Sequence, residues 1–412
     1  MIMTMMRDTF FLIFGLLFVN TLSGQVKPEI EFGAIAWASY LDSGPDNSPL
    51  QRNDGDATFI SDVSLFLGVD INEHVSFYSE VQSRNGFDFI VYGLSAIYRP
   101  EASGLFNLEF GKFLAPFGTF LSRKWPSENP LMNWPLLYDY RTALSASDLA
   151  QNESELLLVR GRGYGFQYGE TGFEQSSGNS TTATSRKGVR LLSRQVYLTG
   201  FQVFGSSRRF SYHFGATNGS LSNPANINNT TGVQLLGRAT YSPTFGLEFG
   251  SSFAWGGYLD KSSVESQLET VDKSAQDFRQ TALGFDLSYS FGHLIFFSEL
   301  LFNRWESPFI DEDLDVVAFD LEIKYRFLTR FYLAGRFSRI DFKNIDDPED
   351  VDGDGFLRES WDYDVDQLEV GVGYHFNRNA LLKVFHVFNT THDIRGGDPS
   401  DDQFTTQLVV SF

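Results

Sequence analysis

The last nine residues of the sequence, Phe404-Thr405-Thr406-Gln407-Leu408-Val409-Val410-Ser411-Phe412, have the pattern of a β-strand. Side chains of a β-strand alternate between its two faces. One face here carries Phe404, Leu408, Val410 and Phe412, and the other mostly carries Thr405, Gln407 and Ser411. A soluble protein seldom ends on a bare apolar strand, whereas a closed barrel in a membrane pairs its last strand with its first and leaves no edge. The ending therefore predicts a closed transmembrane β-barrel.

Segments with the same alternation recur along the whole chain. In residues 279–291, for example, Leu283, Phe285 and Leu287 share one face, and Asp286 and Ser288 share the other. Apolar side chains outside and polar ones inside are typical of a water-filled barrel. We therefore expect an all-β fold, a closed antiparallel transmembrane β-barrel of about 16 strands. The predicted strands are 29–41, 57–71, 75–84, 88–98, 105–113, 195–204, 209–218, 231–241, 246–256, 279–291, 294–303, 315–327, 331–340, 363–376, 381–389 and 402–412.

The connections between these strands alternate in length, which is typical of outer-membrane barrels with short periplasmic turns and long external loops. The short ones are 72–74, 99–104, 205–208, 242–245, 292–293, 328–330 and 377–380. The long ones are 42–56, 114–194, 219–230, 257–278, 304–314, 341–362 and 390–401, and only the second external connection, near 85–86, is a tight hairpin. Residues 156–169 could form a further strand, but a seventeenth strand would break the alternation. We assign them to the third loop, either as irregular chain or as a hairpin above the membrane.

Residues 1–24 have the pattern of a secretory signal peptide, with a short basic start, an apolar run and small residues near Gly24. The run is shorter than the roughly 20 residues that a transmembrane helix needs. We expect residues 25–412 to form a single barrel domain in the outer membrane of a Gram-negative bacterium, surrounded by the lipid bilayer. The 42 Phe and 17 Tyr can face lipid in such a barrel. The chain has no Cys, which excludes disulfides, and a net charge of −20, which argues against a nucleic-acid partner.

The third loop, residues 114–194, is by far the longest connection, and loops beyond roughly 15 residues are usually functional or disordered. Its first half is rich in aromatic residues and proline, so it is expected to pack as a rigid segment inside the lumen, where irregular backbone is tolerated. Its second half contains a Ser/Thr/Gly-rich stretch, 176–185, typical of a flexible exposed segment. The third loop is therefore the predicted constriction.

The segment Phe110-Gly111-Lys112-Phe113-Leu114-Ala115-Pro116-Phe117-Gly118 closes a predicted strand and opens this loop. It resembles the corresponding element of phosphate-selective (polyphosphate-type) outer-membrane porins and their relatives, and the strand number, signal peptide and terminal Phe are similar over the whole mature chain. The resemblance implies a passive diffusion channel for small hydrophilic solutes, commonly a homotrimer, with the third loop folded inward. It also implies that outer-membrane assembly machinery recognises Phe412.

Selectivity depends on which charges line the narrowest point, and an anion-selective pore needs Arg or Lys there. The candidates are Arg123, Lys124, Arg141, Arg160 and Arg162 in the third loop, and Arg84, Arg238, Lys324, Arg326 and Arg336 on the inner wall. The predicted inner wall also holds the acids Asp62, Asp70, Glu80, Glu109, Glu248, Asp286, Glu299, Asp320, Glu322 and Glu369. Either these charges pair across the lumen and stiffen it, or basic residues of the third loop face an acidic wall and create a transverse field.

The seventh external loop contains Asp350-Val351-Asp352-Gly353-Asp354-Gly355-Phe356, which resembles the first half of a calcium-binding loop. Asp350, Asp352 and Asp354 would supply carboxylate oxygens and Phe356 a carbonyl oxygen. Trp361 stands where such loops have a bidentate Glu, so Glu359 or Asp362 would have to substitute. A structural calcium ion and a hydrated acidic loop both remain open, and no other cofactor is predicted.

No enzyme is predicted, because the six His are scattered through turns and strands and no nucleotide-binding or zinc-binding motif is present. The function expected is that of an outer-membrane porin, for solutes that include anions such as phosphate. The alternative is a barrel that acts mainly as a surface adhesion or structural protein. Steady conductance would distinguish a porin from a plugged barrel.

Overall fold

A computed structural model describes residues 28–44, 50, 57–84, 88–163, 166–169, 172–175, 187–194, 197–225, 232–269, 273–394 and 396–412, with backbone only for Arg84, 166–169 and 172–175. The predicted signal peptide, the tight hairpin near 85–86 and the Ser/Thr/Gly-rich stretch 176–185 lie outside these residues. None of the helices within the described ranges has the length and apolar character needed to cross a membrane.

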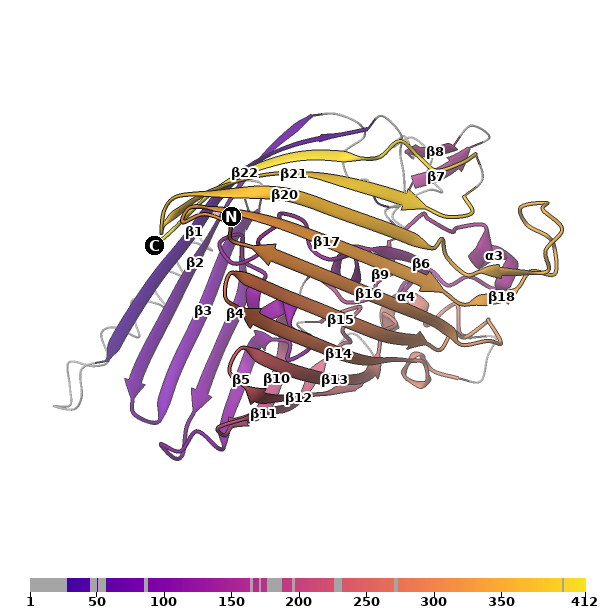
Figure 1. The fold of residues 1–412 in the computed structure, drawn as a ribbon. Helices are drawn as coiled ribbons and strands as arrows, with labels where there is room; N and C mark the ends of the chain where they lie inside the picture. The colour runs from indigo at the N-terminus through magenta and orange to yellow at the C-terminus, as the bar shows by residue number, and fades with distance from the viewer. Residues whose placement is uncertain are drawn as a thin grey trace.

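Sixteen antiparallel strands form one closed barrel, as the alternating pattern predicts (Figure 1). In order around the barrel they are β1 (Glu29–Ser43), β2 (Thr58–Asn72), β3 (Val75–Arg84), β4 (Asp88–Tyr98), β5 (Asn107–Leu114), β10 (Tyr197–Ser206), β11 (Phe210–Asn218), β12 (Val233–Thr244), β13 (Leu247–Gly257), β14 (Arg279–Phe291), β15 (Leu294–Trp305), β16 (Leu314–Tyr325), β17 (Phe331–Phe342), β20 (Val365–Asn377), β21 (Ala380–Thr391) and β22 (Gln403–Ser411). Each strand pairs with its neighbours in the chain, so the topology is up-and-down throughout.

The outer surface of the barrel is apolar, because the large side chains of each strand point away from the lumen. Phe59, Phe89, Phe214 and Phe285 are exposed, whereas Asp286, next to Phe285, is buried on the inner side. An apolar belt on a closed barrel is the surface that faces lipid in a transmembrane barrel. The chain is therefore a membrane-spanning barrel of the outer-membrane type.

The barrel closes between its first and last strands. β1 pairs with β22 from Ile35 opposite Ser411 to Ser43 opposite Gln403. Beyond the strand, the Phe412 and Ala34 backbones exchange two hydrogen bonds of 3.0 Å, and the Phe412 ring lies 6.2 Å from the ring of Phe32. The terminal residue is thus part of the seam that closes the barrel.

Deleting Phe412 is expected to lower the yield of folded barrel several-fold. The deletion removes two backbone hydrogen bonds, each worth about 0.5–1.5 kcal/mol, and an aromatic contact from the seam. The folded fraction is measured as protein that migrates differently in SDS before and after heating. Phe245→Ala removes a fully exposed aromatic from the β12–β13 turn and serves as the control. Equal losses in both variants would show that Phe412 has no special part in closure.

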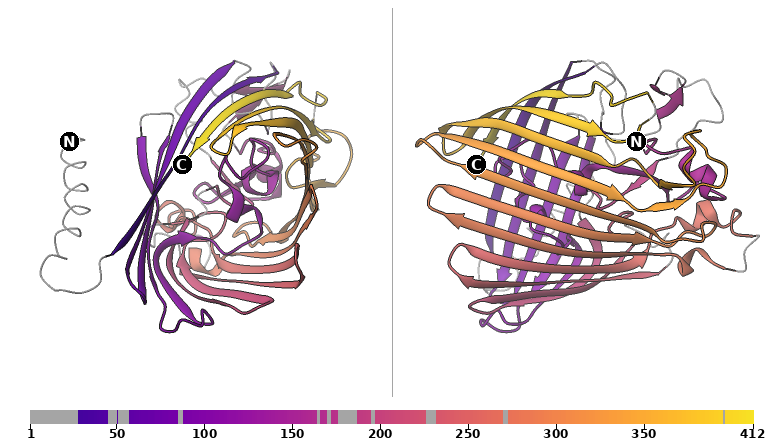
Figure 2. Two further views of the ribbon diagram at one scale, coloured as in Figure 1. Left: turned by 60° about the vertical axis from the view of Figure 1, so that its left-hand side comes forward. Right: turned by 45° about the vertical axis from the view of Figure 1, so that its right-hand side comes forward.

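The connections follow the predicted alternation. Short turns join the strands at the end where the C-terminus lies, and the long loops extend from the other end (Figure 1). The third loop, which the structure places at 115–196, contains η2 (Phe120–Arg123), α2 (Leu136–Asp139), β6 (Arg141–Ser145), α3 (Glu153–Leu157), β7 (Phe166–Gly169), β8 (Gly172–Gln175) and β9 (Gly188–Arg190). β7 and β8 pair only with each other, so residues 156–169 belong to the loop and add no strand to the barrel. The view down the barrel places much of this loop inside the ring of strands (Figure 2).

The other loops carry short elements as well. The fifth external loop holds α4 (Lys261–Val264) and η3 (Ala275–Asp277). The seventh external loop, residues 343–364, holds a two-stranded sheet of β18 (Asn344–Asp346) and β19 (Arg358–Ser360).

Candidate constriction and lumen cavity

The third loop packs against the inner wall through a large apolar core. Phe120, Leu137, Tyr138 and Leu156 of the loop are almost fully buried. They belong to one cluster with inward-facing wall residues, which include Leu236, Ala254, Ala282, Leu301, Ala318 and Ile340. The expectation of a polar inner face is therefore wrong for this part of the wall, because the loop replaces water there. Burial of each large side chain contributes about 1.5–3 kcal/mol.

The same loop also reaches the opposite wall. Trp125 packs edge-on against Phe66 of β2, with ring centroids 4.9 Å apart. Trp125 and Met132 join a second apolar cluster with Ile35, Phe66, Tyr332, Ala334, Leu381, Phe385 and Val409. The loop therefore holds both sides of the barrel.

Acidic side chains of the wall hold the backbone of the loop. Glu299 of β15 accepts hydrogen bonds from the N–H groups of Thr119 (2.6 Å) and Phe120 and from the Tyr138 hydroxyl (2.6 Å). Glu369 of β20 accepts from the N–H groups of Met132 (3.2 Å) and Asn133 (3.3 Å). These carboxylates are buried and act as caps for loop turns rather than as charges open to the lumen.

Basic side chains of the wall donate hydrogen bonds to backbone carbonyl groups of the same part of the loop. Arg336 of β17 donates to the Asn133 carbonyl at 2.7 Å and pairs with Glu322 at 2.5 Å and Glu369 at 3.2 Å. Lys383 of β21 donates to the Asn129 and Leu131 carbonyls at 2.8 and 3.0 Å. Residues 129–133 are thus fixed by three neighbouring strands.

Two basic residues at the start of the loop meet acids on the wall. Arg123 forms an ion pair with Glu322 of β16 and stacks on the Phe297 ring, 3.7 Å from its centroid. Lys124 lies 3.7 Å from Glu80 of β3 and 3.4 Å from the centroid of the Trp125 ring. The sequence left two alternatives, charges that pair across the lumen or basic loop residues that face an acidic wall. Arg123 and Lys124 combine the two, because they face acids of the wall and are buried in ion pairs with them.

These contacts show how the loop crosses the lumen. Phe120 is bound to β15, and Lys124, four residues later, is paired with Glu80 on β3. In the order of the barrel β15 is the eleventh strand and β3 the third, so they are eight of sixteen strands apart and face each other. The loop therefore divides the lumen at this level.

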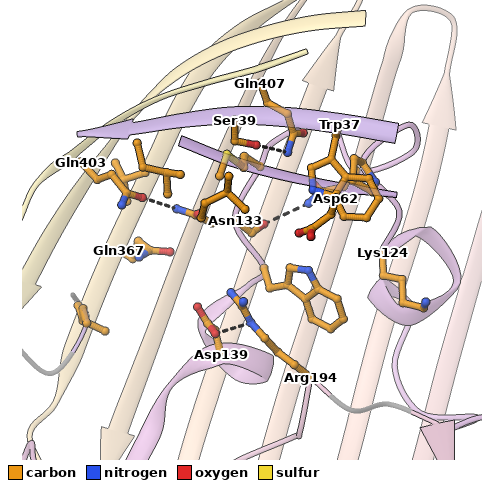
Figure 3. Close-up of a pocket in the computed structure, with 18 of the residues that line it drawn as sticks. Trp37, Ser39, Asp62, Lys124, Asn133, Asp139, Arg194, Gln367, Gln403 and Gln407 are labelled. Carbon is orange, nitrogen blue, oxygen red and sulfur yellow. Dashed lines mark hydrogen bonds and ion pairs between the residues drawn. The ribbon is translucent and has the colours of Figure 1, made fainter. Parts of the chain in front are cut away.

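A cavity of about 530 Å³ remains between the third loop and the wall (Figure 3). The wall side is rich in amides, with Gln82, Gln367, Asn389, Gln403 and Gln407, and it also offers Asp62 and Trp37. The loop side offers Lys124, Trp125, Trp134, Asp139, Arg141, Arg190 and Arg194. The lining is thus polar and aromatic, with basic groups concentrated on the loop.

Three arginines of the loop line this cavity, and two of them lie beside Asp139. Arg194 Nε lies 2.5 Å and Arg190 Nη2 3.9 Å from Asp139 Oδ1. Arg141 stands opposite Arg190 in the β6–β9 pair and donates to the Gly188 carbonyl at 2.8 Å. We call Arg141, Arg190 and Arg194 the arginine cluster.

Among the predicted basic candidates, Lys124 and Arg141 line the cavity. Arg190 and Arg194 were missed, because only the pairing of β6 with β9 brings them beside Arg141. On the wall, Arg238 pairs with Asp286 at 2.5 Å. Lys324 lies over the ring of Tyr332, and Arg326 is exposed just after the end of β16. Arg162 follows the buried Arg160 in the third loop, and the side chain of Arg84 lies outside the described part of the chain.

Two residues fasten the seventh loop to the third loop, Arg160 of the third loop and Asp362 of the seventh. Arg160 pairs with Asp352 at 3.1 Å and with Glu359 at 2.9 Å. Asp362 is fully buried and accepts hydrogen bonds from the N–H groups of Ala143 and Gly161, both at 2.7 Å. Burial raises the pKa of Asp362 to about 6, although these N–H groups act in the opposite direction. Arg160 is therefore a loop anchor, and Asp362, which the sequence offers as an alternative calcium ligand, is engaged with the backbone of the third loop.

Comparison with known proteins gives no match to a family model and none to a curated protein. Solved structures do match. OmpT of Vibrio cholerae has a TM-score of 0.53 at 10% identity, covering 95% of this chain and 100% of that one. The anion-selective porin of Comamonas acidovorans has a TM-score of 0.54 at 10% identity, covering 94% and 100%. The outer-membrane channel DcaP of Acinetobacter baumannii has a TM-score of 0.54 at 11% identity, covering 95% and 100%. The chain therefore has the closed-barrel fold of outer-membrane porins.

Proposed function

We propose that this protein is an outer-membrane porin of a Gram-negative bacterium that lets small hydrophilic solutes diffuse passively. The observation that carries the proposal is the passage of the third loop from β15 to β3, which leaves a cavity with polar and charged lining beside it. A loop pinned across a closed barrel narrows the lumen without a moving part, as a diffusion channel requires. The fold shared with an anion-selective porin and with the channel DcaP supports it.

The arginine cluster supports a preference for anions, of which phosphate is one. Most of the predicted inner-wall acids are taken up by contacts that hold the loop or pair with wall bases, as Glu299, Glu322, Glu369 and Asp286 are. The cavity, in contrast, has more basic than acidic groups on its loop side. The whole lining holds four basic side chains and three acidic ones, Asp62, Asp139 and Asp401, so the positive charge that attracts anions is concentrated on the loop side.

The matched structures include a trimer form of Vibrio cholerae OmpT, with a TM-score of 0.51 at 10% identity over 94% of this chain. This supports a homotrimer as the assembly of the present protein. Insertion by the outer-membrane assembly machinery, with Phe412 as its signal, belongs to the same proposal. No catalytic role is proposed.

A swelling assay with proteoliposomes tests diffusion directly. Liposomes that contain the purified barrel are placed in isotonic solutions of uncharged sugars of increasing size and of a sugar acid matched in size to one of them. We expect swelling that slows as the sugars grow, and faster entry of the sugar acid than of its neutral counterpart. The second candidate, a structural or adhesive barrel, is favoured by the extent to which the third loop fills the lumen. It predicts no swelling with any solute.

A further inference from the structure

The acidic turn of the seventh loop is folded so that its carboxylates converge. The Asp350 and Asp354 side chains accept hydrogen bonds from the N–H groups of Gly355 at 3.1 Å and Phe356 at 2.8 Å. Asp350, Gly353 and Gly355 have φ values of 50°, 75° and 88°, the left-handed conformations of a tight turn. Trp361 is buried against Trp305 and Phe342, so it takes no part in this turn.

A further carboxylate, which the sequence motif does not include, lies beneath the turn. Asp347 is fully buried, and one oxygen of its side chain accepts from the Val351 N–H group at 2.9 Å. The other oxygen, Oδ1, has no hydrogen-bond partner among the described residues. A buried carboxylate oxygen without a donor is costly, and a bound cation is one of the few partners that can compensate it.

The geometry of the group suits a single ion. Asp347, Asp350 and Asp352 each offer an oxygen, and these atoms all lie within 4.8 Å of one another. Oxygen ligands of Ca²⁺ lie about 2.3–2.6 Å from the ion, so two ligands of one ion are at most about 5 Å apart. A second group, Asp352, Asp354 and Glu359, meets the same limit. In this second group the positive charge is already supplied by the guanidinium of Arg160, which pairs with Asp352 and Glu359.

We propose that the seventh loop binds one calcium ion through Asp347, Asp350 and Asp352. Three carboxylates in an irregular loop are the hard oxygen ligands that Ca²⁺ takes, whereas Mg²⁺ demands a stricter octahedron. The ligand set differs from the one expected from the sequence, because the buried Asp347 replaces Asp354 and the Phe356 carbonyl as a primary ligand. Asp352 also pairs with Arg160 of the third loop. A calcium ion bound to Asp352 therefore stiffens the contact between the seventh loop and the third loop.

Isothermal titration of the full-length folded barrel in detergent with CaCl₂, after treatment with EGTA, tests the site. We expect one ion per chain, and at least tenfold weaker binding in Asp347→Asn and in Asp350→Asn. The matched control is Asp346→Asn, an adjacent exposed residue that pairs with Arg358, and its affinity is expected to stay within twofold of the wild type. Titration with MgCl₂ is expected to give much weaker binding.

Thermal melting supplies a second readout that does not depend on the size of the heat signal. Calcium is expected to raise the melting temperature of the wild type and of Asp346→Asn, but not of Asp347→Asn. In EGTA, Asp347→Asn is expected to melt no lower than the wild type, because the amide removes an uncompensated buried charge. Absence of calcium binding by the wild type, or wild-type affinity in Asp347→Asn, would overturn the proposal.

Discussion

Replacing Arg336 by Met is expected to lower the free energy of unfolding by about 3–5 kcal/mol, the usual cost of breaking a buried ion pair from one side. The Arg336 guanidinium is fully buried between Glu322 and Glu369 and also holds the Asn133 carbonyl. Met fills a similar volume but leaves Glu369 without its counter-ion. Unfolding in urea of the barrel in detergent, followed by tryptophan fluorescence, measures the difference.

Arg339→Met is the matched control for this variant, because Arg339 lies three residues further along the same strand but on the outer side. Its side chain is 44% exposed and pairs with Asp341 at 2.6 Å, so its removal is expected to cost less than about 1 kcal/mol. Equal losses of unfolding free energy in the two variants would show that the buried ion pairs of Arg336 do not stabilise the third loop.

Replacing the arginine cluster by Gln, in the triple variant Arg141→Gln, Arg190→Gln and Arg194→Gln, is expected to lower the anion-to-cation permeability ratio by about tenfold or more. Each charge contributes on the order of 1 kcal/mol to the energy of an ion about 4 Å away in water, and about 1.4 kcal/mol corresponds to a tenfold change. The reversal potential across a tenfold KCl gradient in a planar bilayer measures the ratio.

A control of equal charge comes from three exposed arginines outside the cavity. Arg304→Gln, Arg339→Gln and Arg358→Gln together remove the same number of positive charges from side chains that are 44–52% exposed. Salt screens such distant charges within about 10 Å at 0.1 M, so the reversal potential is expected to stay at the wild-type value. An equal shift in both triple variants would mean that net charge, and not the arginine cluster, sets the selectivity.

The barrel could be predicted from the sequence because lipid imposes alternation on every strand separately. Leu283, Phe285 and Leu287 point to lipid for the same reason as Phe404 and Leu408, so each strand gives the same information. The register at closure is a consequence of the same constraint, since a one-residue slip would turn Phe404 and Leu408 inward.

The roles of the inward residues could not be predicted in the same way. Alternation places Glu299 and Glu369 on the inner face, but it does not reveal that they bind loop backbone that is 180 and 237 residues away in the chain. Partners so distant are determined by how the third loop folds, and its aromatic and proline-rich sequence has no simple period. The count of acids on the wall therefore overstated the negative charge that an ion would meet.

The same limit applies to the smaller sites. Arg190 and Arg194 reach the cavity only through the pairing of β6 with β9, two short strands that the sequence pattern does not predict. Asp347 lies three residues before the acidic motif and directly after β18, and its N–H group extends the β18–β19 pairing by a hydrogen bond of 2.8 Å to the Leu357 carbonyl. In both cases the motif indicated the region, and local strand pairing selected the residues.

The single-channel current of the wild-type protein in a planar bilayer shows whether the barrel is an open diffusion channel. A barrel whose third loop is pinned to β15 and β3 should give discrete current steps that are proportional to voltage and steady at low voltage, because nothing in this arrangement has to move for ions to pass. The heat-dependent mobility of the protein in SDS shows that it is folded before it is inserted in the bilayer. If such folded and inserted protein gave no current steps, the barrel would be closed and the protein would not be a diffusion channel.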